Sequence, residues 1–383
     1  MYVSRMKGLS LIEMMIAMVL GLVLMLGVIQ VFSASQAASR LSEGVARAQE
    51  SGRFAIDFLE RDIRMAGHMG CVADQAHFVQ GQGEPSINTG VATGSASPLD
   101  FSVAIQGYEA AGTSGSSGKV APGGGNIPAG MPSTITSLSP APVAGSDVLV
   151  LRFLAPEGVP VTGISALSAS SADVTVNDNA RLARFNEGGV ATPTLFGVAD
   201  CNQVNIFAGT LKTDRVTSSG TALRAYSGLA KIYRADSLVY YIGLNAQGEP
   251  GLRRARADSS GKYVINEELV EGVENMQLLY GLDSTTSIVP GSFPAGNVTA
   301  QQPASVIGVA TTSAVAEQWR RVASVQVGLV VRSPMPASSV APTRDEGQLS
   351  VLGVAYDQSA VTDGRYRTVY EVTIALRNRL FGN

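Results

Sequence analysis

The chain is poor in histidine, cysteine and charged residues, and each shortage excludes a kind of protein. Among its 383 residues are two histidines, His68 and His77, and two cysteines, Cys71 and Cys201. A zinc site built from four Cys/His ligands would need all four, and mechanisms that use several histidines are almost excluded. Charged residues make up 15% of the chain and the net charge is −3, so the strongly basic balance typical of a nucleic-acid-binding domain is missing. Hydrophobic residues still make up 45%, which argues against a chain that is disordered throughout.

The motifs of common enzyme classes are also missing. No serine lies in a G-x-S-x-G sequence, and there is no H-E-x-x-H. The segment Gly112–Lys119 differs from a phosphate-binding P-loop, because five residues separate its two outer glycines instead of four and Val120 replaces the required Ser or Thr. We therefore predict a protein that is not an enzyme and that needs no cofactor.

Metal and phosphate sites are weakly indicated as well. The run from Asp173 to Asn179 begins like a calcium loop, but it lacks the glycine at position six and the glutamate at position twelve. The clusters Arg253–Arg256 and Arg320-Arg321 could contact phosphate. We interpret them instead as charges at strand edges that prevent aggregation, and we interpret the carboxylate pair Glu267/Glu268 as exposed. We thus predict no metal site and no nucleic-acid partner.

The N-terminus carries the strongest signal. The segment 1–8 is short and basic, and Glu13 is the only charged residue between Leu9 and Ser39. The 19 uncharged residues from 14 to 32 would form a helix of about 28 Å, close to the ~30 Å core of a bilayer. The basic leader is expected to stay cytoplasmic, which directs the rest of the chain outward.

Three interpretations of this segment compete. A cleaved secretory signal would use the small residues Ser33-Ala34-Ser35, but the apolar run is longer than the usual length of about 7–15 residues. A plain membrane anchor would leave Glu13 unexplained. The third interpretation gives Glu13 a function, because an ionisable residue at this depth is costly and needs a partner.

Cleavage between Gly8 and Leu9 would supply that partner. It would create an α-amino group four residues before Glu13, on the same chain or on a neighbouring subunit. In a bundle of apolar helices, pairing of this amine with the carboxylate of Glu13 would fix the axial register between subunits.

The sequence Gly8-Leu9-Ser10-Leu11-Ile12-Glu13 resembles the class III signal of type IV prepilins and pseudopilins. Gly8 matches the residue before the cleavage site, Leu9 the N-methylated first residue, and Glu13 the glutamate at the fifth position. Leu9 and Ser10 replace the usual Phe and Thr, and the apolar character at Leu9 is kept.

Beyond the apolar run, residues 33–66 have the pattern of an amphipathic helix. Apolar or small residues recur every three or four positions and predict one buried stripe: Leu41, Val45, Ala48, Gly52, Ala55, Leu59 and Ile63. Three i,i+4 pairs with the acid first support the helix: Glu43–Arg47, Asp57–Arg61 and Glu60–Arg64. Gly67 is expected to end it.

The rest of the chain predicts a β-rich domain. Residues 81–146 are rich in glycine and indicate loops, with short strands near 101–105. Strands are predicted at 147–154, 252–256, 275–282, 322–332 and 368–377, and a hairpin at 230–244 that turns at Ala235-Asp236. The segment 266–274 could be a short helix or an acidic strand edge. In the last two strands apolar and polar residues alternate, which is typical of half-buried antiparallel strands.

Five segments, Arg61–Cys71, Gly145–Phe153, Val198–Phe207, Leu269–Gly281 and Thr368–Leu380, resemble the PilW family of minor pilins, which is similar to the J-type minor pseudopilins of type II secretion. The resemblance implies an α+β pilin-like fold, in which a long N-terminal helix precedes an antiparallel β-rich globular domain with long Gly-rich loops. It implies a leader at 1–8, a helix at 9–66 that spans the membrane at 9–32, and a periplasmic domain at 67–383 with a loop-rich insertion at about 81–146.

The resemblance also implies a function without catalysis. A minor pilin primes pilus assembly within a tip-proximal complex and supports twitching motility and adhesion. Its partners would be prepilin peptidase, other minor pilins, the major pilin, the inner-membrane assembly platform and, as a further candidate, a tip adhesin. The protein would cross the bacterial inner membrane once and then enter the pilus. A minor pseudopilin of a type II secretion system and a DNA-uptake pilin remain the alternatives. In the oxidising periplasm Cys71 and Cys201 most simply form a disulfide.

Overall fold

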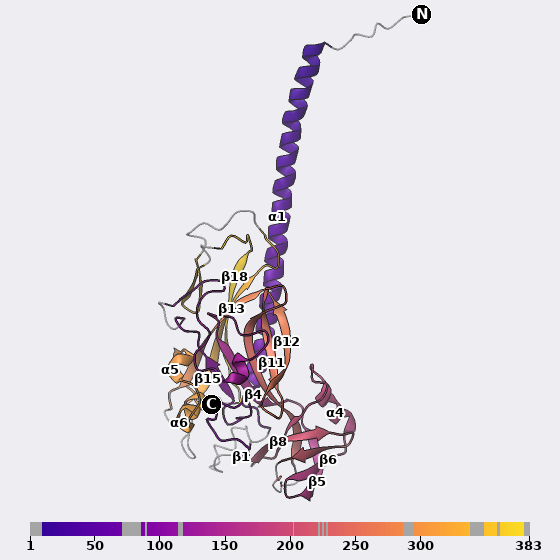
Figure 1. Cartoon of the computed structure of the whole chain (residues 1–383), viewed down its shortest axis with the longest axis vertical. Coiled ribbons are helices and arrows are strands. Elements are labelled where there is room, and N and C mark those ends of the chain that lie inside the picture. The colour runs from indigo at the N-terminus through magenta and orange to yellow at the C-terminus, as the bar shows by residue number, and fades with distance from the viewer. Residues whose placement is uncertain are drawn as a thin grey trace, which may run out of the picture.

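The structure is a computed structural model, and it describes residues 10–70, 86–88, 90–113, 118–201, 203–220, 223, 226, 229–285, 295–337, 348–357 and 361–378. Gly8, Leu9, Cys71 and His77 lie outside the described residues. One long helix, α1, projects from a β-rich body, and the free end of the helix points away from that body (Figure 1).

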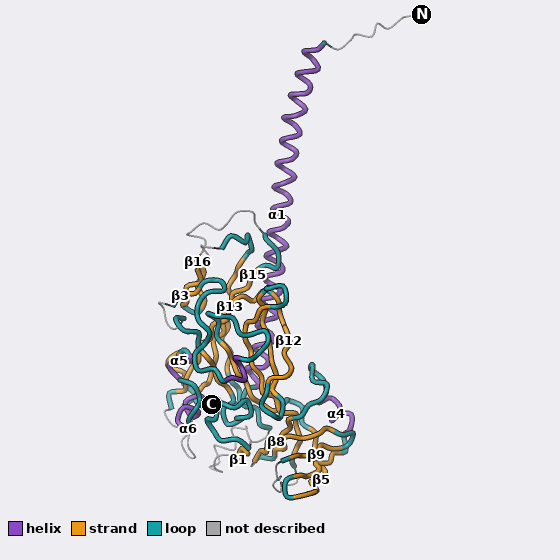
Figure 2. Tube along the Cα trace, in the orientation of Figure 1, coloured by secondary structure: helices purple, strands orange, loops and turns teal. Residues whose placement is uncertain are grey.

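The helix α1 (Leu11–Met65) has 55 residues and is about 80 Å long at 1.5 Å per residue. Ser10 is its N-cap, and Gly67 follows its C-terminal end with a φ of 76°, a backbone conformation that glycine adopts without strain. Residues 10–43 are all exposed, and the first buried residue is Gly44. The helix thus has a free N-terminal half and a C-terminal half that packs against the body (Figure 2).

The buried face of α1 matches the predicted stripe only in the C-terminal half of the helix. The predicted residues that are buried are Ala48, Gly52, Ala55, Leu59 and Ile63. The prediction for Leu41 is wrong, because the body first contacts the helix three residues later, at Gly44, and Leu41 is exposed.

The predicted ion pairs on α1 form only in part. Glu60 and Arg64 pair as expected. Arg47 pairs with Glu50, at 3.6 Å between nitrogen and oxygen, rather than with Glu43. These side chains are largely exposed, so such pairs contribute little to stability.

The body contains three sheets whose ladders are antiparallel except for β1–β8 and β17–β3. The part of the largest sheet next to α1 consists of β2 (Ile105–Tyr108), β4 (Val148–Leu154), β10 (Lys231–Leu244), β11 (Pro250–Ala257) and β12 (Tyr263–Glu271). A four-stranded sheet has the order β14 (Val298–Gln302), β13 (Val273–Asp283), β15 (Val322–Arg332) and β18 (Arg367–Ala375). A small sheet joins β16 (Gln348–Val351), β17 (Val354–Asp357) and β3 (Lys119–Val120). Three short helices border them: α3 (Ser133–Thr136), α5 (Ala304–Ile307) and α6 (Ser313–Arg320).

A second part of the largest sheet forms a lobe at the end of the body far from the free helix (Figure 1). We call it the distal lobe, and it consists of β1 (Ser86–Asn88), β5 (Val159–Ser168), β6 (Ser171–Val176), α4 (Asn179–Ala183), a 3-10 turn (Arg184–Asn186), β7 (Leu195–Ala199), β8 (Gln203–Leu211) and β9 (Arg215–Ser219). The lobe has its own apolar core, which includes Phe185, Phe196 and Phe207.

The strand β10 corrects one prediction. The hairpin expected at Ala235-Asp236 is wrong, because β10 continues through both residues. Its first half pairs with β5 and β7, and its second half pairs with β4 and β11. A buried aspartate does not break the strand here, because Arg234 and Arg256 both bond to the carboxylate of Asp236.

The other predicted strands agree with the structure to within a few residues. They correspond to β4, β11, β13, β15 and β18. The segment 266–274, left open between helix and strand, belongs to the end of β12 and the start of β13. The fold is therefore a long N-terminal helix followed by a mainly antiparallel β-rich domain.

The helix and the sheets share one large core. Leu59 and Ile63 of α1 lie in the same apolar cluster as Tyr280 of β13 and Trp319 of α6. At Gly52 the approach is closest, because a Cβ atom built on this glycine would lie 2.2 Å from the ring of Tyr370 on β18. Any side chain at position 52 would therefore displace the ring of Tyr370 from the helix.

We expect Gly52→Val to destabilise the body by about 1–3 kcal/mol, the usual cost of overpacking a close contact. Denaturant unfolding of the detergent-solubilised protein, followed by fluorescence of the single tryptophan Trp319, measures this change. Gly27→Val is the matched control, since nothing lies within 4 Å of a Cβ at that position of the same helix. Equal unfolding midpoints for the two variants would contradict the close contact.

Candidate assembly interface

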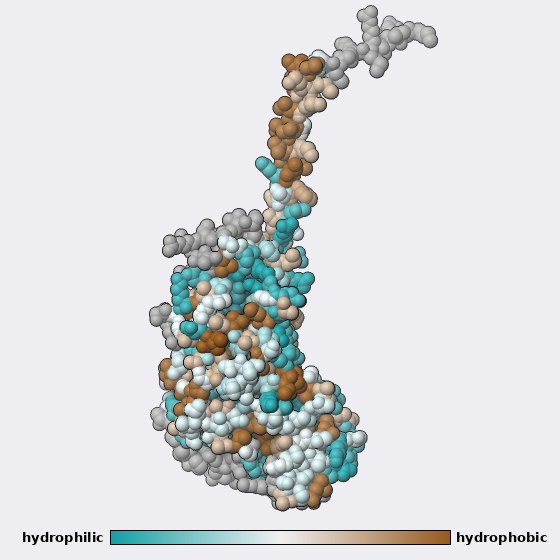
Figure 3. All heavy atoms as spheres, in the orientation of Figure 1, coloured by the Kyte–Doolittle hydropathy of each residue, from teal (hydrophilic) through white to brown (hydrophobic). Residues whose placement is uncertain are grey.

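The free half of α1 exposes a continuous apolar surface. Seventeen large apolar residues between Leu11 and Phe32 are 50–80% exposed, and they cover the helix on the side seen in Figure 3. Soluble monomeric proteins rarely expose apolar patches of this extent. By length and composition this helix can cross a membrane, and the same surface can pack against other apolar helices.

Glu13 lies in the first turn of this apolar half and its side chain is exposed. The Ser10 hydroxyl accepts a hydrogen bond from the backbone N–H of Glu13, with 3.2 Å between nitrogen and oxygen. A carboxylate in the first turn is favourable beside the positive end of the helix dipole. No ion pair of Glu13 occurs within the described part of the chain, and its predicted role in subunit register stays a prediction.

The packed half of α1 carries a buried carboxylate, Asp62. Asp62 accepts hydrogen bonds from the hydroxyl of Tyr240 on β10, at 2.5 Å, and from Arg254 on β11, at 3.0 Å. Arg254 also donates to Glu267 on β12, at 2.6 Å. Burial and the neighbouring Asp62 carboxylate raise the pKa of Tyr240 well above its usual value, so the phenol remains a donor. This cluster joins the helix to three strands through charge as well as apolar contact.

The structure corrects the interpretation of the arginine run on β11. The strand lies between β10 and β12 and is not an edge, so its arginines do not protect an edge from aggregation. Arg253 pairs with Glu268 at 3.0 Å, and Arg254 pairs with Asp62 and Glu267. Glu267 and Glu268 are half-buried partners of these arginines, and the interpretation of them as exposed is wrong. Asp173 of the candidate calcium loop instead bonds to Arg215 and Thr217.

A second ionic cluster lies where the free half of α1 leaves the body. Glu274 on β13 accepts hydrogen bonds from Arg367 on β18, at 2.7 Å, and from Arg332 on β15, at 3.1 Å. Arg365 pairs with Glu249 at 2.8 Å. Nearby, a Cβ on Gly44 of α1 would lie 2.9 Å from the Cβ of Ala337, which follows β15. The cluster thus holds together the strand ends against which the helix begins to pack.

Two carboxyl groups lie close together at the side of the body. Asp147 accepts hydrogen bonds from the backbone N–H groups of Ala110 and Leu278, both at 2.8 Å. Glu109 accepts from Thr113 and from the backbone of Ala304. Burial raises the pKa of Glu109 to about 7, and burial together with Glu109 raises the pKa of Asp147.

The contribution of Glu109 to the stability of the protein is therefore expected to fall as the pH rises toward 7. In the unfolded chain Glu109 loses its proton near its ordinary pKa of 4.5, whereas in the folded chain it holds the proton up to about 7, so the folded state binds more protons between these values. Glu109→Gln should remove this part of the pH dependence and gain most stability, relative to wild type, at alkaline pH. Denaturant midpoints of both proteins, measured between about pH 4.5 and about pH 8, give the difference. A difference that stays constant with pH would contradict this role.

The remaining residues singled out in the sequence lie apart from Glu13. Cys201 follows β7 in the distal lobe. Its predicted pairing with Cys71 stays a prediction, because Cys71 is not among the described residues. His68 shares a hydrogen bond of 2.8 Å between its Nδ1 and the carbonyl of Leu154, and burial lowers its pKa. Within the described ranges no group of three or more His, Cys, Asp or Glu residues could hold a metal ion.

Sequence reasoning missed Asp62 and Arg254 as the residues that join the helix to the sheet. A signal was present, since Asp62 lies three residues after Leu59 and next to Ile63, on the stripe predicted to be buried. A charged residue on a buried stripe requires a partner of opposite charge.

Comparison with known proteins gives two family matches. Residues 239–378 match the family described as "Type IV Pilus-assembly protein W", and residues 3–29 match the "Prokaryotic N-terminal methylation motif". The comparison with curated proteins gave no match. Among solved structures, a type IV-like pilin from Thermus thermophilus is 12% identical with a TM-score of 0.22, over 49% of this chain and 85% of that chain.

The two matched regions lie in different parts of the molecule. The first covers the second half of β10 and the elements from β11 to β18, which include the four-stranded sheet that α1 packs against. The second covers the N-terminal part of the helix as far as residue 29, with Glu13 inside it. Strands β5 to β9 of the distal lobe fall outside both matched regions.

Proposed function

We propose that this chain, which matches the PilW family over residues 239–378, is a minor pilin that primes type IV pilus assembly and has no catalytic activity. A pilus-related structural role is supported by the PilW match together with the N-terminal methylation motif. The finer statements about processing, position and partners below are proposals.

The observation that carries the proposal is the division of α1 into two halves. The free half exposes an apolar surface from Leu11 to Phe32 that contains one carboxylate, Glu13, and the packed half is held to the body by the Asp62 cluster and an apolar core. A helix of this kind is stable in a bilayer or among other apolar helices, since burial of its surface contributes about 25 cal/mol per Å². The protein would pass from the membrane into a fibre when neighbouring subunits replace the lipid around its apolar helix.

Processing would create the group that Glu13 needs. Prepilin peptidase would cut between Gly8 and Leu9 and methylate the amine of Leu9. Glu13 would then pair with the amine of its own or a neighbouring subunit, and in a low-dielectric fibre core this pairing would set the axial register. The subunit would first contact the inner-membrane assembly platform. In the fibre it would take a tip-proximal position together with other minor pilins, above the major pilin. A role in twitching motility and adhesion would follow from this position.

The N-terminal peptide of the mature protein tests this proposal. Mass spectrometry of the membrane fraction should find a chain that starts at N-methylated Leu9, and sheared surface fibres should contain the same form. A chain that starts at Gln36 would identify a secreted protein, and an intact Met1 would identify a simple anchor. Either of these results would overturn the proposed role in assembly. A correctly processed chain that is absent from pili and present only in a secretion complex would identify a pseudopilin instead.

A further inference from the structure

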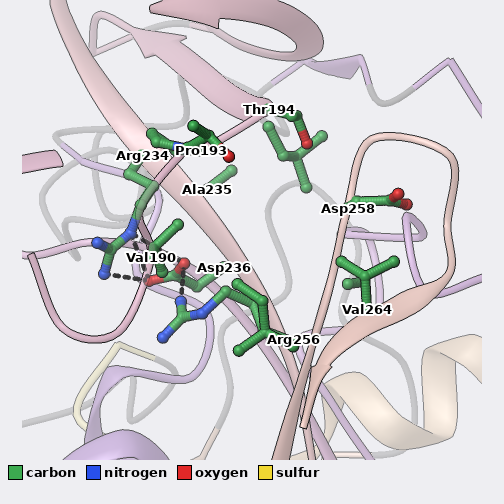
Figure 4. A pocket seen from close by; sticks show the side chains of 13 residues that line it. Val190, Pro193, Thr194, Arg234, Ala235, Asp236, Arg256, Asp258 and Val264 are labelled. Carbon is green, nitrogen blue, oxygen red and sulfur yellow. Dashed lines mark hydrogen bonds and ion pairs between the residues drawn. The ribbon is translucent and has the colours of Figure 1, made fainter. Parts of the chain in front are cut away.

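A small cavity lies where the distal lobe meets the sheet of β10, β11 and β12. Its volume is about 190 Å³. One wall is the lobe segment that includes Val190 and Thr194, and the other includes Arg256, Asp258 and Val264. Figure 4 shows Arg234 and Arg256 on either side of Asp236, with Asp258 and Val264 farther to the right, beyond Arg256.

The charges at one end of this cavity do not balance. Arg234 bonds to both oxygens of the Asp236 carboxylate, each at 3.1 Å, and Arg256 bonds to the same carboxylate. The three side chains are 14%, 9% and 4% exposed, for Arg234, Arg256 and Asp236 in turn. Burial opposes ionisation of Asp236, but Arg256 and Arg234 outweigh it and hold its pKa below the usual value. Two buried arginines therefore share the carboxylate of Asp236, and Asp258, the other acid of the lining, forms no ion pair with either arginine within the described part of the chain.

The two arginines differ in how well their donors are satisfied. Arg234 also donates to the backbone carbonyls of Phe185, at 2.9 Å, and Glu187, at 2.6 Å. Arg256, by contrast, bonds only to Asp236 within the described part of the chain, although a guanidinium carries five N–H donors. The hydroxyl of Thr194 accepts a bond from the backbone of Ser259 at 3.1 Å, and its own O–H has no acceptor among the residues described. Donors thus remain available on two walls of the cavity.

The geometry points to a binding site for a single carboxylate on a short aliphatic chain, and we propose that it receives the side chain of a glutamate or aspartate of a partner protein. Arg256 would hold the carboxylate by its free N–H groups, and the Thr194 hydroxyl would add a further donor. Val190 and Val264 would contact the methylene groups. This site is independent of the proposed role of the helix in assembly.

The other features of the cavity restrict the ligand. A volume of about 190 Å³ is below the ~300–1,000 Å³ of sites for drug-sized ligands, so only a small group fits. The Asp258 carboxylate bonds to the backbone of Ser260, at 2.9 Å, and of Lys262, at 3.1 Å, and it would repel a second negative charge on the ligand. The apolar walls favour an aliphatic chain over a sugar acid, whose hydroxyl groups would need partners.

Isothermal titration calorimetry on the full chain in detergent, at low salt, tests this site with four probes. N-acetylglutamate α-amide carries the proposed side chain, and N-acetylglutamine amide is its neutral counterpart. Glucuronate and glucose form the corresponding pair for a sugar acid. We expect saturable binding of N-acetylglutamate α-amide with a millimolar dissociation constant, typical of so small a ligand, and much weaker binding of the other three.

Variants separate binding in the cavity from binding elsewhere. Val264→Trp should fill the cavity and abolish binding while leaving Asp236 and its arginines in place, because Val264 is 58% exposed and its replacement is tolerated by the fold. Val298→Trp on β14 is the matched control. Arg256→Gln should weaken binding about tenfold or more through loss of charged hydrogen bonds, and Arg184→Gln on the same lobe should not.

Three results would overturn the proposal. These are the absence of saturable binding, equal binding by the Val264→Trp and Val298→Trp proteins, and tighter binding of glucuronate than of N-acetylglutamate α-amide. The last result would assign the cavity to an acidic polysaccharide. None of them bears on N-terminal processing, so failure here is distinguishable from failure of the proposed function.

Discussion

Replacing Glu13 with alanine is expected to leave the protein abundant and cleaved in the membrane but to remove it from sheared fibres by at least about tenfold. If Glu13 pairs with an α-amine among apolar helices, its loss leaves that amine buried without a partner. Breaking one side of a buried ion pair costs about 3–5 kcal/mol, and about 1.4 kcal/mol already corresponds to a tenfold change in an equilibrium. Immunoblots of membrane and fibre fractions, normalised to total protein, measure the effect.

The control for this prediction lies on the same helix. Glu50 pairs with Arg47 at 3.6 Å, and its side chain is 55% exposed, so Glu50→Ala removes a charge of the same sign without removing a buried partner. It should change incorporation little. Fibres that contain the Glu13→Ala and Glu50→Ala proteins in equal amounts would refute the register argument, provided that both proteins are processed equally.

Arg254→Met should produce the largest loss of folding stability, about 3–5 kcal/mol, because it leaves Asp62 as a buried carboxylate without its cationic partner. The two side chains are 14% and 10% exposed, and Glu267 loses its partner as well. Methionine keeps most of the volume of the arginine stem, so the change isolates the charge. Denaturant unfolding followed by Trp319 fluorescence gives the free energy of unfolding.

Two further proteins make this prediction specific. Arg184→Met removes an arginine whose pair with Glu157 is 3.6 Å long and 59% exposed on both sides, and its cost should be about 0–1 kcal/mol. Adding Asp62→Asn to Arg254→Met should restore part of the stability, because the buried charge is then gone. A double variant that is as unstable as the sum of its two single changes would show that Asp62 and Arg254 act independently.

Much of the fold was predictable, because long periodic signals depend little on distant residues. The helix followed from an uncharged run and a stripe at three- and four-residue spacing. Strands β15 and β18 were found from the alternation of apolar and polar residues, but the prediction that both are half-buried is wrong for β15, which lies between β13 and β18 and is buried on both faces. Failures occurred where a distant partner changed the meaning of a residue. Asp236 looked like a turn residue, and the Arg253–Arg256 run looked like exposed edge charges, until their partners of opposite charge were known.

The candidate site was also predictable only in part. Glu13 was identifiable because a single carboxylate in an apolar run is conspicuous in sequence. The cluster of Asp62, Tyr240, Arg254 and Glu267 was not, because its members are up to 205 positions apart by their numbers (267 − 62) and meet only through packing. The distal lobe was missed as a unit because its core residues come from several separate segments.

The continuity of β10 has a mechanical consequence. This 14-residue strand is shared by the distal lobe and by the sheet that packs against α1. A tensile load that is applied to the lobe and resisted at α1 passes along β10. Hydrogen bonds to β4 and β11 are perpendicular to the strand, so a pull along it loads many of them together in shear instead of peeling them apart one by one. A subunit joined in this way transmits force through its β-sheet without a hinge between the two parts.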